Sequence, residues 1–279
     1  MKIQEIENIE ISLLLEAIYG RYGYDFRDYA RATVERRSRL FAKNTGLKSI
    51  SELIPRIMRD EMFFERLVKE FSITVTELFR DPSSYKELKL KVFPILKTYP
   101  FIKIWHAGCA TGEEVYSLAI LLKQEGLYDK ATIYATDFND EALEVAKNGI
   151  YSIDNMKQCT ANYLAAGGTD ALSDYYYAKH ESVIFDKSLR KNVMFANHNL
   201  TTDGIFGEMH LVMCKNVLIY FNKTLQNKVL NLFCDSLIHS GYLCLGSKES
   251  ILFTDVENKF ENIDKGERIF RKITGTANV

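Results

Sequence analysis

Proline and tryptophan are scarce in this sequence, and long uninterrupted apolar runs are absent. The 279 residues include 4 prolines and 1 tryptophan. Because a helix needs about 20 consecutive apolar residues to cross a bilayer, we expect no direct membrane insertion. The first residues, MKIQEIENIE, are too acidic for a secretory signal peptide. We therefore expect a soluble cytoplasmic protein.

An excess of charge of either sign is also lacking. The 36 Lys and Arg residues nearly balance the 37 Asp and Glu residues, so the net charge is −1. A chain with this balance has no overall field to attract nucleic acid or an anionic membrane. We expect no nucleic-acid partner, and any basic recognition must come from a local patch.

Cysteine pairs of the CxxC kind are missing as well. The odd number of cysteines and their apolar surroundings predict reduced, buried thiols, and they exclude a disulfide framework or a zinc site. The histidines show no metal-ligand spacing, so no metal is expected. We place His106 and His198 at strand ends, without a catalytic role. The cysteines are Cys109, Cys159, Cys214, Cys234 and Cys244.

Residues 1–72 show helical apolar spacing and no strand pattern. A basic stretch over 27–43 predicts one helix. The pattern from Ser49 to Glu52 resembles a capping box and predicts that another helix covers 49–59. We predict a helical N-terminal domain over 1–72, followed by a linker over 73–99.

From about residue 100 the pattern changes to alternating strands and helices. This alternation predicts an α/β domain over 100–279, in which helices cover both faces of a mostly parallel sheet. Residues 160–192 fit the pattern poorly and predict a small inserted β-subdomain. The predicted strands are 101–107, 131–136, 192–196, 211–214, 242–246 and 268–273, and the predicted helices are 113–125, 140–148 and 225–239.

A glycine turn follows the first predicted strand, and an acidic residue ends the second. Gly108 and Gly112 permit positive φ and a close backbone approach to a ligand. Asp137 is placed to accept hydrogen bonds from ribose hydroxyls at the carboxyl end of the sheet. The spacing is G-x-x-x-G, so the dinucleotide fingerprint G-x-G-x-x-G is not met.

Two glutamates then begin the helix. The carboxylates of Glu113 and Glu114 would repel a pyrophosphate at this helix start, but they suit a ligand with a sulfonium and an ammonium group. The pattern therefore favours S-adenosyl-L-methionine over a nicotinamide dinucleotide. The alternative is that both glutamates only stabilise the helix dipole.

Four motifs, in this order, carry a family resemblance. They are TELFRD over 76–81, GEEVYS over 112–117, Asn199-Leu200, and CKNVLIYF over 214–221. Together they resemble the CheR family of protein-glutamate O-methyltransferases, which modify chemotaxis receptors. The resemblance implies a class I methyltransferase domain, Rossmann-like with an antiparallel last strand, joined to a helical N-terminal domain and carrying a β-subdomain. It also implies S-adenosyl-L-homocysteine as the product.

The resemblance assigns roles to individual residues. It implies that Arg80 and Tyr220 are catalytic. The residues that it and the turn place at the cofactor are Thr74, Thr76, Arg80, Gly108, Glu114, Asp137, Asn199, Leu200, Lys215 and Asn216. Thr74 stands where family members often have Asn, and Lys215 stands where they often have Arg, which loses the planar fork. The alternatives are that Arg80 pairs with Asp81 and that Tyr220 is a core residue.

The basic stretch suggests how a protein substrate docks. The resemblance implies that Arg31, Arg36, Arg37 and Arg39 bind the acidic cytoplasmic helices of a chemoreceptor, and the alternative is a solvated helix face. We expect a monomer. Two further hypotheses stay open at this point: a non-catalytic sensor or scaffold that binds S-adenosylmethionine, and a small-molecule carboxyl methyltransferase.

Overall fold

The change in sequence pattern near residue 73 coincides with a division in the structure. The computed structural model describes residues 3–72 and 74–273. They divide into two units. The N-terminal unit contains the residues before the linker together with Ile219–Lys228, and the sheet unit contains Thr74–Leu218 and the residues from Val229 onward.

The N-terminal unit is helical, and its core is formed by apolar helix faces. Its helices are α1 (Ile3–Tyr22), α2 (Arg31–Asn44), α3 (Leu53–Ile57) and α4 (Glu61–Phe71). Ile11, Leu14 and Ile18 of α1 are completely buried. The side chain of Asp60 caps α4 by accepting a hydrogen bond from the Phe63 N–H at 3.0 Å.

The predicted helix over 49–59 is shorter in the structure. It begins at Leu53, and the expected capping box does not form. The Ser49 hydroxyl interacts with the Ser51 hydroxyl at 3.1 Å and with the Glu52 carboxylate at 3.5 Å. Because the hydroxyl of Ser49 is used by these local side chains, it does not cap a helix N–H group.

A short segment from late in the sequence belongs to the N-terminal unit. Phe221 forms an isolated β-bridge with Tyr29. The Ala30 N–H donates to the Tyr220 carbonyl at 2.7 Å, and the Asn222 side chain donates to Asp28 at 2.9 Å. These bonds attach residues that follow the CKN motif to the loop before α2.

The sheet unit contains a seven-stranded sheet in the order β6-β2-β1-β7-β8-β10-β9. Strands β6, β2, β1, β7 and β8 are parallel, whereas β10 is antiparallel to both β8 and β9. The predicted fold class is thereby confirmed, including the antiparallel last strand. The bounds are β1 (Ile102–Ala107), β2 (Ala131–Asp137), β6 (Val193–Asn197), β7 (Met209–Cys214), β8 (Leu237–Leu245), β9 (Phe260–Asp264) and β10 (Ile269–Lys272).

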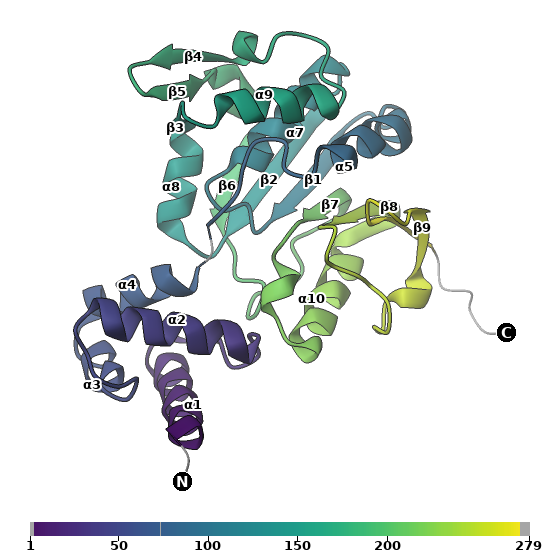
Figure 1. Ribbon diagram of the computed structural model, residues 1–279. Coiled ribbons are helices and arrows are strands. Elements are labelled where there is room, and N and C mark those ends of the chain that lie inside the picture. The colour runs from purple at the N-terminus through teal and green to yellow at the C-terminus, as the bar shows by residue number, and fades with distance from the viewer. Residues whose placement is uncertain (1–2, 73, 274–279) are drawn as a thin grey trace, which may run out of the picture. The chain divides into compact units, whose positions relative to one another are not determined.

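Helices cover both faces of this sheet (Figure 1). Ile104 of β1 belongs to the same buried core as Leu118 of α7. On the opposite face, the Trp105 ring packs edge-on against Phe233 of α10, with ring centroids 5.3 Å apart. The helices are α5 (Pro82–Glu87), α6 (Phe93–Leu96), α7 (Glu113–Gln124), α8 (Asp140–Asn148) and α10 (Lys223–Ser236), with a π-helical turn at Leu88–Val92. The linker therefore contains helices.

A second sheet of three strands, in the order β3-β5-β4, forms the inserted subdomain. It begins earlier than the predicted residue 160, because Ile150 of β3 pairs with Ile184 of β5. The bounds are β3 (Ile150–Ser152), α9 (Met156–Ala165), β4 (Tyr176–Lys179) and β5 (Ser182–Phe185). The Phe185 ring stacks on Tyr116 of α7 at 5.0 Å, which joins the subdomain to the main core.

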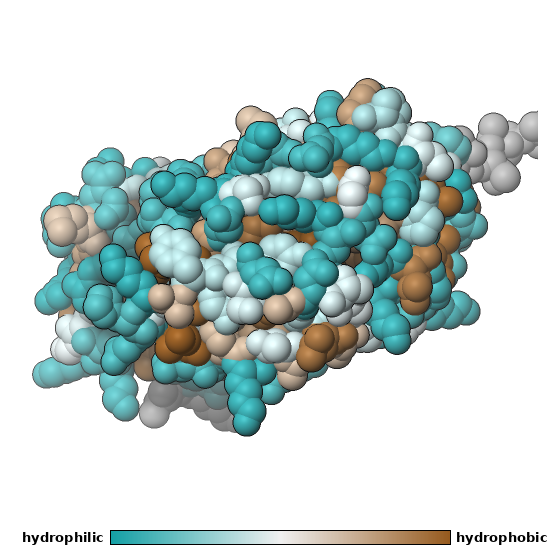
Figure 2. Space-filling model, turned by 90° about the horizontal axis from the view of Figure 1, so that it is seen from above, coloured by the Kyte–Doolittle hydropathy of each residue, from teal (hydrophilic) through white to brown (hydrophobic). Residues whose placement is uncertain are grey.

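The surface of the face seen from above is mostly hydrophilic, with hydrophobic residues scattered over it (Figure 2). The cysteines are all free and buried, as the sequence predicted. No helix among residues 3–72 and 74–273 is long and apolar enough to cross a membrane.

Candidate active site

The glycine turn lies where β1 ends, at the carboxyl edge of the parallel strands. Gly108 has φ +71° and Gly112 has φ +92°, so both adopt conformations that side chains rarely allow. A Cβ atom on Gly108 would lie 2.5 Å from Cγ2 of Val217. The backbone therefore passes closely by the turn after β7, and only glycine fits at this position.

Asp137, at the end of β2, determines the shape of this turn. Its Oδ2 accepts a hydrogen bond from the Ala110 N–H, and its Oδ1 accepts one from the Asn139 N–H, both at 2.9 Å. Burial raises the pKa of Asp137, and the two backbone donors oppose that change. Each carboxylate oxygen has a further lone pair that can accept a hydrogen bond from a ribose hydroxyl. Binding of a ribose by Asp137 stays a prediction.

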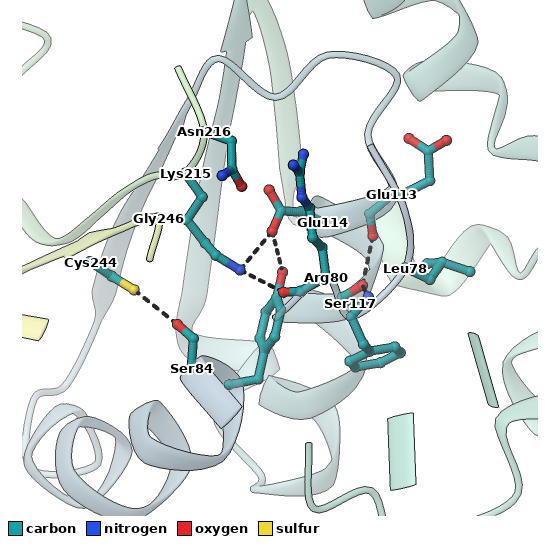
Figure 3. Close-up of polar contacts among 12 residues, drawn as sticks. Leu78, Arg80, Ser84, Glu113, Glu114, Ser117, Lys215, Asn216, Cys244 and Gly246 are labelled. Carbon is teal, nitrogen blue, oxygen red and sulfur yellow. Dashed lines mark hydrogen bonds and ion pairs between the residues drawn. The ribbon is translucent and has the colours of Figure 1, made fainter. Parts of the chain in front are cut away.

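A buried ion pair joins Glu114 to Lys215. The Lys215 Nζ lies 2.9 Å from Oε1 of Glu114, and the Lys215 side chain is 0 % exposed. The same ammonium donates to the Arg80 backbone carbonyl at 2.7 Å and lies 4.6 Å from the centre of the Tyr85 ring. The Tyr85 hydroxyl donates to the same Glu114 oxygen at 3.2 Å. Figure 3 shows the Lys215 ammonium between Glu114 and the Arg80 carbonyl.

Both members of the pair are charged. Burial alone would raise the pKa of Glu114, but the Lys215 ammonium, together with His106 and Arg80, holds that pKa below its ordinary value. Burial would lower the pKa of Lys215, yet Glu114 keeps it raised. Among the described residues, nothing hydrogen-bonds to the second Glu114 oxygen, Oε2, so that oxygen is left to accept from a ligand ammonium.

Arg80 lies beside this pair, on a strained part of the linker. Phe79 and Asp81, on either side of it, have φ of +54° and +53°. The Phe79 N–H donates to the Ser117 hydroxyl at 2.8 Å, and the Lys215 ammonium holds the Arg80 carbonyl. These bonds keep a backbone conformation that side chains otherwise disfavour.

The guanidinium group of Arg80 extends past Glu114 (Figure 3). It donates to the Val75 carbonyl at 3.2 Å. Within the described ranges it has no carboxylate at ion-pair distance, and it therefore does not pair with Asp81. The positive charge of Arg80 acts on Glu114 without a hydrogen bond, so its other N–H donors are available to an anionic group.

Three buried side-chain oxygens within the motifs lack partners among the described residues, and one of them is Oδ2 of Asp81. Among the described residues, neither Oδ1 of Asn216 nor Oγ1 of Thr76 has a hydrogen-bond partner. Buried polar groups are normally satisfied, and such atoms mark places where a ligand or water completes the bonding. Together with Oε2 of Glu114, Asn216 and Thr76 leave two acceptors and one hydroxyl open to a ligand such as S-adenosylmethionine. The residues therefore fit that cofactor.

The sequence analysis missed Glu249, which holds the turn after β7. Its carboxylate accepts hydrogen bonds from the N–H groups of Asn216 at 3.0 Å, Leu218 at 2.7 Å and Gly246 at 2.6 Å. Asn216 has φ +61°, and these bonds stabilise that conformation. An acidic residue just after a strand, at the carboxyl edge of a parallel sheet, is the signal that could have identified Glu249.

Of the remaining predicted residues, Asn199 and Leu200 follow the end of β6, whereas Thr74 lies in the linker. The Asn199 side chain accepts hydrogen bonds from the N–H and the hydroxyl of Thr201, so it shapes the turn that positions the buried Leu200. Thr74 is half-buried at the start of the sheet unit. Tyr220 lies in the N-terminal unit, and its placement against Arg80 stays a prediction.

The two histidines placed at strand ends in the sequence are both buried. Burial lowers the pKa of His106, and in the described ranges neither of its ring nitrogens has a partner. The His198 ring packs edge-on against Trp105, with centroids 5.2 Å apart. Among residues 3–72 and 74–273, no group of three or more His, Cys, Asp or Glu side chains could hold a metal ion.

The arginines of α2 mostly form contacts within the N-terminal unit. Arg39 pairs with Glu7 at 2.6 Å and with Glu35. Arg37 pairs with Glu70 at 3.0 Å. Arg31 donates to the Ser12 hydroxyl at 3.4 Å and to the Asn8 carbonyl. Arg36 is exposed and has no ion-pair partner among the described residues.

The parallel sheet with its antiparallel last strand, the glycine turn and the acidic end of β2 define a class I S-adenosylmethionine-dependent methyltransferase. Residues 74–269 match the family described as CheR methyltransferase, SAM binding domain, and residues 9–72 match its all-alpha domain. The chain belongs to the CheR methyltransferase family. Its cofactor is S-adenosylmethionine, and the product is S-adenosylhomocysteine.

Relatives of similar length support this membership. A Pseudomonas putida protein described by name as a methyltransferase, Cher3, is 49% identical over 265 residues, covering 95% of this chain and 97% of the relative. A chemotaxis protein methyltransferase of Vibrio parahaemolyticus is 30% identical, covering 97% and 98%. One of Borreliella burgdorferi is 28% identical, covering 87% and 88%.

Glu113 gives this site a pH-dependent contribution to stability. Burial raises the pKa of Glu113 to about 7 from an ordinary 4.5, although the Thr111 hydroxyl donates to it at 2.7 Å. The folded protein thus holds this proton more tightly than the unfolded chain. The resulting stability is complete below pH 4.5 and is lost as the pH rises through about 7.

We expect Glu113→Gln to remove this loss. From pH 5 to pH 8, ionisation of Glu113 should cost the wild type on the order of 2 kcal/mol in free energy of unfolding. The variant should not lose this amount, because it has no buried carboxylate at position 113 to ionise. Urea unfolding at both pH values measures the difference, and other titrating groups cancel between the two proteins. The same pH dependence in both proteins would show that Glu113 titrates normally.

Proposed function

We propose that this methyltransferase forms methyl esters on glutamate side chains of chemoreceptor proteins, in chemotaxis-type signalling. The observation that carries the proposal is the Arg80 guanidinium, which lies beside Glu114 with no carboxylate partner within the described ranges. Such a group suits an acceptor carboxylate, because guanidinium can bind both oxygens. The relatives named chemotaxis protein methyltransferase support the signalling role.

The chemistry asks mainly for positioning. A glutamate carboxylate is ionised at neutral pH and is already a nucleophile, so no general base is required. The bound cofactor would supply an electrophilic methyl group on its sulfonium. Arg80 then orients the carboxylate without neutralising it fully, and Tyr220 contributes a hydrogen bond or a packing surface. Orientation of this kind is worth roughly 7–11 kcal/mol of the barrier.

The linker contributes both cofactor and acceptor contacts in this proposal. Thr76 and Arg80 lie in the segment 73–99 that joins the helical domain to the methyltransferase domain. The Lys215 ammonium holds the Arg80 carbonyl, so the linker is attached to the same ion pair that places Glu114. Cofactor and acceptor groups are therefore positioned together.

A protein substrate accounts for the exposed charge of α2. Arg36 and Lys43 are exposed and lack ion-pair partners among the described residues, and Leu40 between them is 41% exposed. Residues three and four apart lie on one helix face. We propose that this face binds the acidic receptor helix, while Arg31, Arg37 and Arg39 hold α2 in place and add to the positive field.

The decisive experiment transfers a labelled methyl group from S-adenosylmethionine to receptor cytoplasmic fragments. We expect base-labile label on glutamate. Arg80→Ala should reduce transfer roughly 10²–10³-fold, the range for losing one preorganised charge-stabilising group. Calorimetry with S-adenosylhomocysteine is the control. The affinity of Arg80→Ala for S-adenosylhomocysteine should fall much less than its rate of methyl transfer. Binding of S-adenosylhomocysteine without transfer to any carboxylate would instead identify a sensor.

Docking through α2 makes a separate prediction. Arg36→Glu should slow methylation of the receptor about tenfold through KM, because a like charge would face the acidic helix. Affinity for S-adenosylhomocysteine should not change. Arg59→Glu is the matched control, since Arg59 is also exposed and without an ion-pair partner in the described part of the chain, but it lies outside α2. Equal effects of both variants would refute docking by this face.

A further inference from the structure

The loop after β8 ends in an exposed apolar tip formed by Leu252 and Phe253. Phe253 is 98% exposed and is the most exposed large hydrophobic side chain in the described part of the chain, and Leu252 is 51% exposed. Phe253 also has φ +61°, in the left-handed region. Bulky residues rarely adopt that conformation, whereas glycine and asparagine do so readily.

Folding alone does not account for a phenylalanine at this position. Its ring is almost completely in water, so it contributes little to the core, and its backbone conformation costs free energy. A phenylalanine that exposes its ring and also adopts an unfavourable backbone conformation is better explained by binding to another molecule than by the stability of the fold. Exposed apolar groups held in this way are characteristic of surfaces that bind another molecule.

The tip is held in a defined conformation. The Phe253 N–H donates to the Glu257 carboxylate at 2.7 Å, and the Thr254 hydroxyl donates to the Ile251 carbonyl at 2.6 Å. The Leu252 N–H donates to the Ser250 hydroxyl at 3.1 Å. These bonds hold the tip outward before any partner binds, which lowers the entropic cost of binding.

Two buried residues anchor the loop on either side of the tip. Ile251 is 2% exposed and Val256 is 0% exposed. The chain therefore leaves the core at Ile251 and returns to it at Val256. Leu252 and Phe253 project from a short, anchored turn and not from a free segment.

The base of the loop is part of the active site. β8 is parallel to β7, so both strands end at the edge that carries the glycine turn. Glu249, just before the tip, binds the N–H groups of Asn216 and Leu218 in the turn after Lys215. The chain from Glu249 to Phe253 spans at most about 14 Å. The tip thus lies close to the residues that bind the cofactor.

We propose that Leu252 and Phe253 form a docking contact for the acceptor protein, in which they pack on apolar side chains of an amphipathic acidic helix beside the methylated glutamate. This inference rests on the proposed function. Leu252 and Phe253 are neighbours in the chain and both exposed, so they suit the surface of a macromolecule and not a small molecule. Lys248 is exposed at the base of the loop, but Asp255 and Glu257 lie closer to the tip, so the apolar pair and not charge carries the proposed contact.

The size of the contact favours a substrate over a second copy of this chain. One aromatic side chain covers roughly 150–250 Å². A stable dimer interface buries more than about 1,000 Å². A two-residue tip therefore cannot hold a dimer by itself. It can strengthen a transient encounter that the cofactor site completes, and a central aromatic residue often dominates such a contact.

Phe253→Asn separates this role from a structural one. Asparagine tolerates the left-handed conformation, so the variant should be at least as stable as wild type and should bind S-adenosylhomocysteine with unchanged affinity. Methylation of the receptor fragment should fall about tenfold in kcat/KM, mainly through KM. Leu252→Ser should show a smaller fall of the same kind.

Phe101→Ser provides the matched control, because Phe101 is also an exposed phenylalanine, at 58%, but it precedes β1 at the opposite edge of the sheet. It should methylate the receptor like wild type. Wild-type kinetics of Phe253→Asn would overturn the proposal, as would a loss of stability or of S-adenosylhomocysteine affinity that accounts for its defect. If wild type itself neither binds nor methylates the receptor, the proposed function fails and this inference fails with it.

Discussion

The buried ion pair between Glu114 and Lys215 is the interaction on which the rest of the active site depends. Lys215 comes from the turn after β7, Glu114 comes from the first turn of α7, and the Arg80 carbonyl, which the same ammonium binds, comes from the linker. Three segments far apart in the sequence therefore meet at one charge. Burying two ions carries a large desolvation cost, and it is offset here by their mutual attraction and by hydrogen bonds from Tyr85 to Glu114 and from Lys215 to the Arg80 carbonyl. The pair also leaves the second Glu114 oxygen, Oε2, without a hydrogen bond among the described residues.

Two further carboxylates are used for backbone geometry. Asp137 binds the N–H group of Ala110 in the glycine turn, and Glu249 binds the N–H groups of the turn around Asn216. Ala110 and Asn216 both have positive φ, at +48° and +61°. Backbone conformations of this kind persist only where surrounding contacts enforce them. The cofactor site is thus built on strained turns, and buried anions keep those turns in place.

How much was predictable from the sequence differs between elements for physical reasons. β1, β2 and α7 are buried apolar segments, and their periodicity identified them and the turn between them. β9 was missed, because as an edge strand it contains mostly polar residues, of which Glu261 and Asn262 are exposed. Glu249 was missed because its hydrogen bonds reach residues far away in the sequence. The pairing of Arg39 with Glu7 likewise depends on tertiary structure, so the charge free for docking could not be read from α2 alone. The substrate assignment depends on the family resemblance together with the unpaired Arg80.

The central claim is that the Glu114–Lys215 pair organises the cofactor site. A cycle of Lys215→Met, Glu114→Gln and the double variant tests it most directly, with urea unfolding and S-adenosylhomocysteine calorimetry measured on each protein. Lys215→Met should destabilise the protein by about 3–5 kcal/mol, because it leaves Glu114 buried and unpaired. The double variant should recover much of that stability but should still bind S-adenosylhomocysteine weakly, because it lacks the carboxylate. Wild-type stability and wild-type affinity in Lys215→Met would contradict the account.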